Sequence, residues 1–456
     1  MLKIKIKAVI FILFTFVGCS SFYTDTEFYQ PILSSLKEGD YNQAVQKIVE
    51  AEIEEEYADK DRLLLRLDKG ILLHYQGNYQ QSNIELAEAE RIIEELYTKS
   101  ISKGAASMLL NDNALDYSGE VYENLYINIF KALNYINMNM FDEAFVEANR
   151  VNVKLREYDL YFDEMINQLN SSEDSKVKID STQLDYYNNV LANYISHIIY
   201  RADGEYDNSR IALEKLNDAW ATYADVYNYD KPKAVTETTS ERKTFLNIMA
   251  FAGNGPDKKP VGARITTFDD FIIVSDPTNY YADAIPFPGV KYGWNFKFEF
   301  PTLEEVGTEV YDIEVYVDSV YCGRLELLEN MISVAKKTFE TQKSITYFKT
   351  ITRAVLKGIA SSAAGRTIKK ETGDNFLGNV AAALTNALVD ATENADLRSW
   401  RTMPGYCFVG EYDIEPGVYD IEIRFVGENN TFLSSRTYKD FRIINGLNLL
   451  EAYHLN

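Results

Sequence analysis

The chain contains few of the residues that carry most enzyme chemistry. Its 456 residues include only three histidines, at positions 74, 197 and 454, and three cysteines. No two histidines are four residues apart, as two zinc ligands on one helix face would be, and no Gly-x-Ser-x-Gly nucleophile elbow occurs. With 69 acidic residues, pairs of carboxylates arise by chance and do not indicate a glycosidase. We therefore expect a protein that is not an enzyme and that holds no metal or cofactor.

The chain is also short of positive charge. Its 46 lysines and arginines stand against 69 aspartates and glutamates, which gives a formal net charge of −23. Such a surface repels the phosphates of nucleic acids and the headgroups of anionic lipids. The composition argues against nucleic acid as a partner and leaves no broad electrostatic attraction to a membrane.

Only two cysteines, Cys322 and Cys407, lie beyond the first twenty residues. Both stand in strand-like segments, and the chain has no Cys-x-x-Cys motif, so neither a zinc ribbon nor a thioredoxin-like site is indicated. In an oxidising compartment the two thiols could form a disulfide, whereas two buried free thiols are the common alternative. The sequence leaves both alternatives open.

The most apolar stretch of the chain stands at its start. Three lysines among the first seven residues precede the apolar segment 8–17, which is too short to span a bilayer as a helix. Gly18 and Cys19 follow, and this ending resembles the lipobox of bacterial lipoproteins, in which the cysteine is acylated and the peptide before it is removed. The resemblance implies a signal peptide over 1–18, a lipid anchor on Cys19 and a tether over 19–24.

The resemblance also implies a location in the bacterial cell envelope, with an acyl anchor in a membrane. Ser20 and Ser21 follow the cysteine, where some diderm lipoproteins carry an aspartate that retains them in the inner membrane. We therefore expect the outer membrane, on the periplasmic face, with a surface location as the alternative.

The N-terminal half repeats a short pattern four times. Each copy has a turn residue, an aromatic residue two positions later and a small residue three positions after that. The four turn residues are Gly39, Gly77, Asn139 and Gly204; the aromatic and small residues are Tyr41 and Ala44, Tyr79 and Ser82, Phe141 and Ala144, and Tyr206 and Ser209. Glycine or asparagine lets the chain leave one helix in a left-handed turn, the aromatic fills the gap between two helices, and the small residue lets them approach closely.

This pattern resembles the helix-turn-helix unit of tetratricopeptide repeats. It predicts an α-solenoid of helical hairpins over residues 25–225, with helices or loops longer than usual because the copies start 38, 62 and 65 residues apart. Solenoids usually bind a peptide or protein on their concave face. The alternative is that the rest of the chain fills this groove.

The C-terminal half has the alternation of a β-protein. Residues 295–300, 309–320 and 417–426 alternate between apolar and polar side chains, which predicts strands of an antiparallel β-sandwich. We expect the β-domain in two parts, 226–326 and 396–456.

A helical insert is expected between the two parts, over residues 327–395. Its apolar residues follow a helical spacing, and its Ala- and Gly-rich stretches favour close helix packing. A membrane span is disfavoured by its length and by its polar residues, although a membrane-inserting hairpin is an alternative.

The chain around this insert resembles an uncharacterised family of bacterial envelope lipoproteins. The resemblance rests on residues 395–402 (ADLRSWRT), on the Pro-Gly-x-Tyr turn at 416–419 and on the upstream stretch 351–358 (ITRAVLKG). It implies tetratricopeptide-like helices followed by a split β-domain over the whole mature chain. The family provides no enzymatic activity to carry over.

A cluster of charged and aromatic residues accompanies this motif: Arg353, Lys357, Asp396, Arg398, Trp400 and Arg401. One interpretation is a ligand site in which the basic residues bind an anion and Trp400 stacks on a sugar or base. The other is a structural junction in which Asp396 pairs with an arginine and Trp400 fills the gap between helix and sheet.

We expect a non-enzymatic, membrane-anchored scaffold that binds a partner protein in the envelope. This expectation rests on the lipid anchor, on the helical repeats and on the lack of a catalytic motif. The alternative is a protein that binds a glycan or cell-wall fragment at the junction of the β-domain and the helices. A helical-hairpin membrane effector is the third hypothesis.

Overall fold

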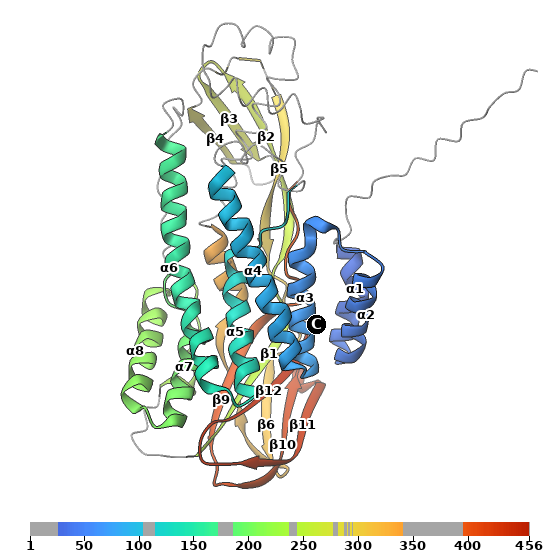
Figure 1. Ribbon diagram of the computed structural model, residues 1–456, viewed down its shortest axis with the longest axis vertical. Helices are drawn as coiled ribbons and strands as arrows, with labels where there is room; N and C mark the ends of the chain where they lie inside the picture. Colours follow the sequence, from blue (N-terminus) through green and yellow to red (C-terminus); the bar gives the residue numbers. More distant parts are fainter. Residues whose placement is uncertain are drawn as a thin grey trace, which may run out of the picture.

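The computed structural model describes residues 26–103, 115–171, 186–236, 244–276, 281–286, 290, 292–293, 295–340 and 395–455 (Figure 1). Cys19, Arg353, Lys357 and most of the expected insert lie outside these ranges. Within them, no helix is both long enough and apolar enough to cross a membrane.

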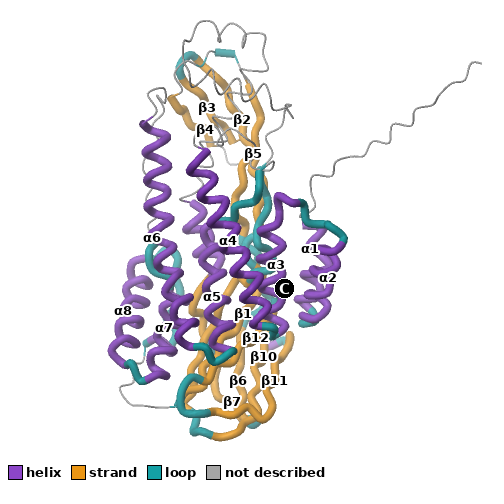
Figure 2. The backbone as a smooth tube through the Cα atoms, viewed as in Figure 1, coloured by secondary structure: helices purple, strands orange, loops and turns teal. Residues whose placement is uncertain are grey.

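Helices form the N-terminal half, as predicted. They are α1 (Thr26–Lys37), α2 (Tyr41–Ile53), α3 (Arg62–Gln76), α4 (Tyr79–Lys103), α5 (Val121–Asn137), α6 (Phe141–Ser171), α7 (Val190–Asp203) and α8 (Tyr206–Thr222), with short 3-10 turns η1 (Asp59–Asp61) and η4 (Lys233–Val235). Consecutive helices pair as four hairpins, and each hairpin packs against the next. The helices follow one another across the face of the strands (Figure 2).

The four turns between paired helices match the predicted pattern. Gly39, Gly77, Asn139 and Gly204 have φ angles of 72, 89, 57 and 83°. Each following helix begins two residues later, at the predicted aromatic residue. The four small residues are buried, as close helix approach requires. The last aromatic is an exception, because Tyr206 is 42% exposed and does not fill a gap between helices.

Twelve strands among the described residues form three four-stranded sheets. The central sheet has the order β12-β1-β9-β8, with β1 (Phe245–Asn254), β8 (Glu326–Asn330), β9 (Pro404–Asp413) and β12 (Asn448–His454). The outer sheet has the order β11-β10-β6-β7, with β6 (Asp312–Val317), β7 (Val320–Arg324), β10 (Gly417–Val426) and β11 (Phe432–Ile443). The arm sheet has the order β4-β3-β2-β5, with β2 (Asp257–Phe268), β3 (Phe271–Asp276), β4 (Tyr281–Pro286) and β5 (Asn295–Glu304). The arm and outer sheets lie at opposite ends of the molecule (Figure 1).

Strand β1 explains how the layers meet, because both of its faces are buried. Met249 and Phe251 join the hydrophobic cluster of the helices, whereas Ile248 and Ala250 join a cluster with strands of the outer sheet. The alternation of side chains along a strand produces this division. The central sheet therefore lies between the helices and the outer sheet.

Two details of the β-region differ from the expectation. Strand β1 pairs with β12 in parallel, at a separation of about 200 residues that no local pattern signals, while the other strand pairs are antiparallel. The predicted helical insert begins with a strand, because Glu326–Asn330 forms β8; helix follows over the described residues 331–340. β8 pairs with β9, so the two predicted parts of the β-domain share one sheet.

Candidate functional site

The charged residues of the ADLRSWRT motif are engaged in ion pairs between the helices and the strands. The Arg398 guanidinium donates to Asp396 at 2.9 and 2.7 Å and to Asp61, in the 3-10 turn before α3, at 2.9 Å. Arg401 donates to Asp257, the first residue of β2, at 2.9 Å. Although burial alone would raise the pKa of Asp396, the Arg398 guanidinium holds it below its usual value.

Trp400 is only 1% exposed. Its backbone N–H donates to Glu123 Oε1 at 2.7 Å, and its ring lies 6.3 Å from the Phe130 ring, centroid to centroid. The indole therefore offers no face to a sugar or base in this structure. These contacts agree with the structural-junction interpretation for Asp396, Arg398, Trp400 and Arg401, while Arg353 and Lys357 lie outside the described residues.

Buried carboxylates connect the helices to the strand region. Asp68, on α3, accepts hydrogen bonds from Tyr29, Tyr57 and Thr402 at 2.6–2.8 Å. Burial raises its pKa to about 6, against the effect of these hydrogen bonds. Glu123, on α5, accepts from Tyr117 and from the backbone N–H groups of Glu120 and Trp400.

Two further carboxylates point from the central sheet toward α5 and α7. Glu329 accepts from Tyr126, Asn189, Tyr227 and the Leu191 backbone. Glu411 accepts hydrogen bonds from Nη1 and Nη2 of Arg201 at 2.9 and 2.8 Å. The faces of these helices that pack on the sheet are thus used within the chain, in agreement with the alternative that the rest of the chain fills the groove.

The two cysteines of the β-region are free thiols. Cys322 is exposed on β7 of the outer sheet, whereas Cys407 is buried on β9 of the central sheet. The disulfide alternative is therefore wrong for this structure. The free-thiol alternative holds, although only Cys407 is buried, and that burial raises the pKa of its thiol.

No group of three potential metal ligands occurs among the described residues. His74 Nδ1 lies 2.7 Å from Asn134 Oδ1, and His197 Nδ1 lies 2.8 Å from Ser209 Oγ. His197 lies between α7 and α8, whereas His74 lies between α3, α5 and strand β12, where its Nε2 is 3.2 Å from Glu451.

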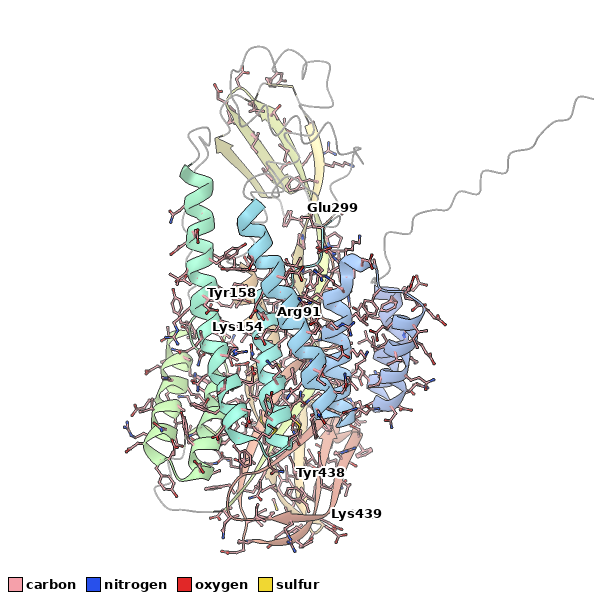
Figure 3. The ribbon with its side chains drawn as sticks, in the orientation of Figure 1. Arg91, Lys154, Tyr158, Glu299, Tyr438 and Lys439 are labelled. Carbon is pink, nitrogen blue, oxygen red and sulfur yellow. The ribbon has the colours of Figure 1, made fainter. Side chains whose placement is uncertain are left out.

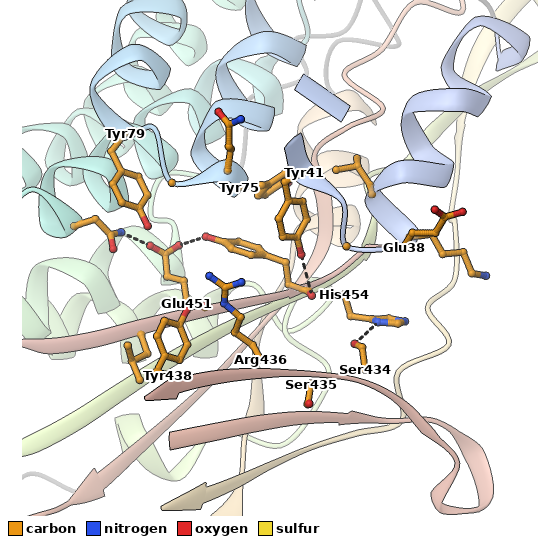
Figure 4. Close-up of a pocket in the computed structure, with 18 of the residues that line it drawn as sticks. Glu38, Tyr41, Tyr75, Tyr79, Ser434, Ser435, Arg436, Tyr438, Glu451 and His454 are labelled. Atoms are coloured by element: carbon orange, nitrogen blue, oxygen red, sulfur yellow. Dashed lines mark hydrogen bonds between the residues drawn. The ribbon is translucent and has the colours of Figure 1, made fainter. Parts of the chain in front are cut away.

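A pocket of about 290 Å³ opens between the helical turns and the edge strands β11 and β12 (Figure 4). The α1–α2 and α3–α4 turns form one side, and the edge strands of the outer and central sheets form the other. Its lining includes Lys37, Glu38, Tyr41, Tyr75, Tyr79, Asn137, Ser434, Ser435, Arg436, Tyr438, Glu451, Tyr453 and His454.

Hydrogen bonds hold the aromatic wall of this pocket. The Tyr41 hydroxyl donates to the Tyr453 carbonyl at 3.4 Å, and the Tyr438 hydroxyl donates to the Glu451 carbonyl. The Tyr453 hydroxyl donates to Glu451 Oε2 at 2.9 Å. Residues more than 370 positions apart in the sequence thus form one concave surface.

Sequence reasoning missed most of this pocket. Tyr41 and Tyr79 were predicted only as packing residues of the repeat, and Arg436 and Tyr438 carried no motif. One signal was present, since Glu451 and His454 form a Glu-x-x-His spacing. That spacing suggests a site on a helix, but it falls in a strand, where its two side chains start on opposite faces.

Comparison with known proteins adds no relative. No family model, no curated protein and no solved structure matches this chain.

Proposed function

We propose that this protein is a non-enzymatic scaffold of the bacterial cell envelope, held at the outer membrane by an acyl chain on Cys19. It binds a partner protein and assembles or regulates it. The basic-then-apolar N-terminal segment and the lipobox-like ending support the anchor. The helical hairpins support the scaffold role, because arrays of such hairpins commonly bind proteins.

We also infer a tetratricopeptide-like solenoid for the hairpins and a β-sandwich for the central and outer sheets. The hairpins pack on one another in chain order, which supports the solenoid. Side chains of both sheets contribute to one hydrophobic cluster, which supports the sandwich.

The partner surface lies on the outer side of the helices, because the side that faces the central sheet is already buried. Helix α6 carries the observation behind this assignment. Val146, Val153 and Leu160 are 53, 44 and 69% exposed and stand seven residues apart, so they form one apolar stripe along the helix. Lys154 and Tyr158 of the same helix instead contact Asn124 of α5 (Figure 3).

The stripe fits a partner helix with an apolar face. Isolated exposed aliphatic residues are common on protein surfaces, but three in line give a helix of the partner a continuous apolar contact. Exposed residues of both charge signs flank the stripe, Arg150 and Arg156 on the one hand and Glu143 and Glu157 on the other.

In-cell crosslinking of the native lipoprotein tests the scaffold. We expect one stoichiometric protein partner, whose capture is lost when Val146, Val153 and Leu160 are all changed to serine. The control is Ile84→Ser, which alters an exposed aliphatic residue of α4 and retains the partner. Failure of the wild type to capture any protein contradicts the scaffold, and unchanged capture by the triple variant contradicts the α6 surface.

The anchor has a separate test. The Cys19→Ala variant loses metabolic labelling with an acyl-chain analogue and leaves the membrane fraction. Retention of the label in this variant contradicts lipidation at Cys19.

A further inference from the structure

The pocket between the helical turns and the edge strands is lined by an arginine that has no carboxylate partner. Among the described residues, no carboxylate forms an ion pair with Arg436, whose guanidinium lies 5.4 Å from the centre of the Tyr438 ring. Arg436 stands opposite the buried Ile423 in the β10–β11 register, so it points to the inner side of the outer sheet at its open edge. Its guanidinium extends toward the tyrosines of the pocket (Figure 4).

The neighbouring carboxylate does not neutralise Arg436, because its own partners already satisfy it. Glu451 accepts from Asn137 at 2.5 Å and from Tyr453 at 2.9 Å, and it lies 3.2 Å from His74 Nε2. Burial would raise the pKa of Glu451, but His74 and these hydrogen bonds hold it below its usual value. Glu451 and His74 thus form a closed polar unit, and the charge of Arg436 remains available.

Two polar groups beside Arg436 also have no partner among the described residues. His454 is 8% exposed, and its Nδ1 lies 2.8 Å from Ser434 Oγ, but its Nε2 has no hydrogen-bond partner. The Tyr79 hydroxyl, which lines the same pocket, makes no hydrogen bond within the described part of the chain. The His454 Nε2 is enclosed by protein atoms, whereas the Tyr79 hydroxyl belongs to the lining of the pocket, where an unpartnered donor favours a polar ligand.

We propose that this pocket binds a small hydroxylated carboxylate of about one sugar ring, such as a sugar acid. Arg436 binds the carboxylate of the ligand, because a planar guanidinium can donate two parallel hydrogen bonds to the two carboxylate oxygens. The rings of Tyr41, Tyr79 and Tyr438 provide rigid contact with the apolar face of the ligand, and the Tyr79 hydroxyl bonds to one of its hydroxyl groups.

Charge and size restrict the ligand to a compact monoanion. Lys37, which also lines the pocket, is paired with Glu309 at 2.7 Å, so the Arg436 guanidinium balances one negative charge of a ligand. A phosphate dianion would add a second charge beside Glu38 and Glu451 in a chain of net charge −23. The volume of about 290 Å³ is at the small end of ligand pockets, which suits a single ring. An inward arginine at a sheet edge also prevents pairing with other strands, a role that requires no ligand.

The site does not use α6, so its test is independent of the scaffold. Titration calorimetry of the full chain at pH 7.5 compares D-glucuronate, D-glucose and D-glucose 6-phosphate. We expect glucuronate to bind most tightly, and Arg436→Gln to weaken it about tenfold or more, because a hydrogen bond to a charged group is lost. Lys439→Gln, which removes a cation of the same strand outside the pocket, leaves the affinity unchanged.

Thermal melts of both variants verify that they fold as the wild type does. Four results overturn the proposal: equal affinity of the Arg436→Gln variant and the wild type, equal binding of glucose and glucuronate, tighter binding of the phosphate, or no binding of any probe at millimolar concentration. If Arg436→Gln binds as the wild type does, or if no probe binds, Arg436 serves only to protect the sheet edge; tighter binding of the phosphate would instead make the pocket a phosphate site.

Discussion

Two carboxylates of the helix–sheet interface, the largely buried Glu411 and the fully buried Glu123, are stabilised in different ways. Glu411, on β9, is paired with Arg201 of α7 through two hydrogen bonds. Among the described residues, Glu123, on α5, receives neutral donors, from the Tyr117 and Tyr122 hydroxyls and from the backbone of Glu120 and Trp400. A buried carboxylate with a cation remains charged, whereas one with neutral donors alone holds its proton to higher pH.

This difference indicates which of the two carboxylates makes the stability of the interface depend on pH. Burial raises the pKa of Glu123 to about 7; Lys258 opposes this effect and Glu120 adds to it. Glu120 is itself paired with Lys258. Glu123 therefore titrates near neutral pH. The contribution of Glu411 to stability depends instead on its cation, Arg201.

Removal of that cation gives the largest expected effect. In the Arg201→Met variant, Glu411 is left largely buried without its charged partner. Breaking a buried pair on one side costs about 3–5 kcal/mol of the free energy of unfolding. Urea denaturation at pH 7, followed by circular dichroism, measures this loss.

The matched control is Arg210→Met. Arg210 pairs with Glu214 at 2.6 Å on α8, but both side chains are more than half exposed. Solvent screens such a pair, so we expect a change below about 0.5 kcal/mol. Similar losses in the two variants would show that burial of the Arg201–Glu411 pair has no special weight.

The second prediction concerns Glu123, whose hydrogen-bond donors are neutral. Because its pKa in the folded state is about 7, against an ordinary value of 4.5, Glu123 keeps its proton in the folded chain while the unfolded chain releases it. Stability from this group is therefore fully present below pH 4.5 and is lost as pH rises to 7. The loss is about 3.5 kcal/mol at most, since the two pKa values differ by about 2.5 units and one unit corresponds to about 1.4 kcal/mol.

The Glu123→Gln variant removes this slope. We expect the wild type to lose more stability than the variant between pH 5 and pH 8, as measured by urea midpoints. Asp68 also has a raised pKa, but it titrates in both proteins, so the difference between them isolates Glu123. Parallel pH profiles for the two proteins would contradict the prediction.

The helical half could be predicted from the sequence because its signals are local. A turn glycine, an aromatic two residues later and a buried small residue act within one hairpin, and all four turns have the expected left-handed residue. The strands on both sides of residues 341–394 could also be predicted, because their apolar and polar residues alternate locally. The parallel pairing of β1 with β12 could not be predicted. The two strands lie about 200 residues apart in the sequence, and their register depends on the packing of β1 between two layers.

The candidate sites were harder to predict for the same reason. The Asp396–Arg401 segment was recognised as important, but its partners Asp61, Glu123 and Asp257 come from three separate elements. The pocket combines helix turns before residue 80 with strands after residue 430. No pattern within a short window carries such a combination, so only the assembled chain reveals it.

The smallest expected loss of stability comes from a change in a hairpin turn rather than in the helix–sheet interface. Gly77 has a φ of 89°, and the position that a Cβ would take has open space for 4 Å around it, so Gly77→Ala meets backbone strain without a clash. Gly262 on β2 has equally open space but no left-handed φ, which makes Gly262→Ala the control. Both changes restrict the unfolded chain alike. We expect Gly77→Ala to be less stable than the control by about 1 kcal/mol in urea denaturation, well below the Arg201→Met effect. A difference near zero would mean that the turn tolerates a side chain, and that the interface alone holds the hairpins in place.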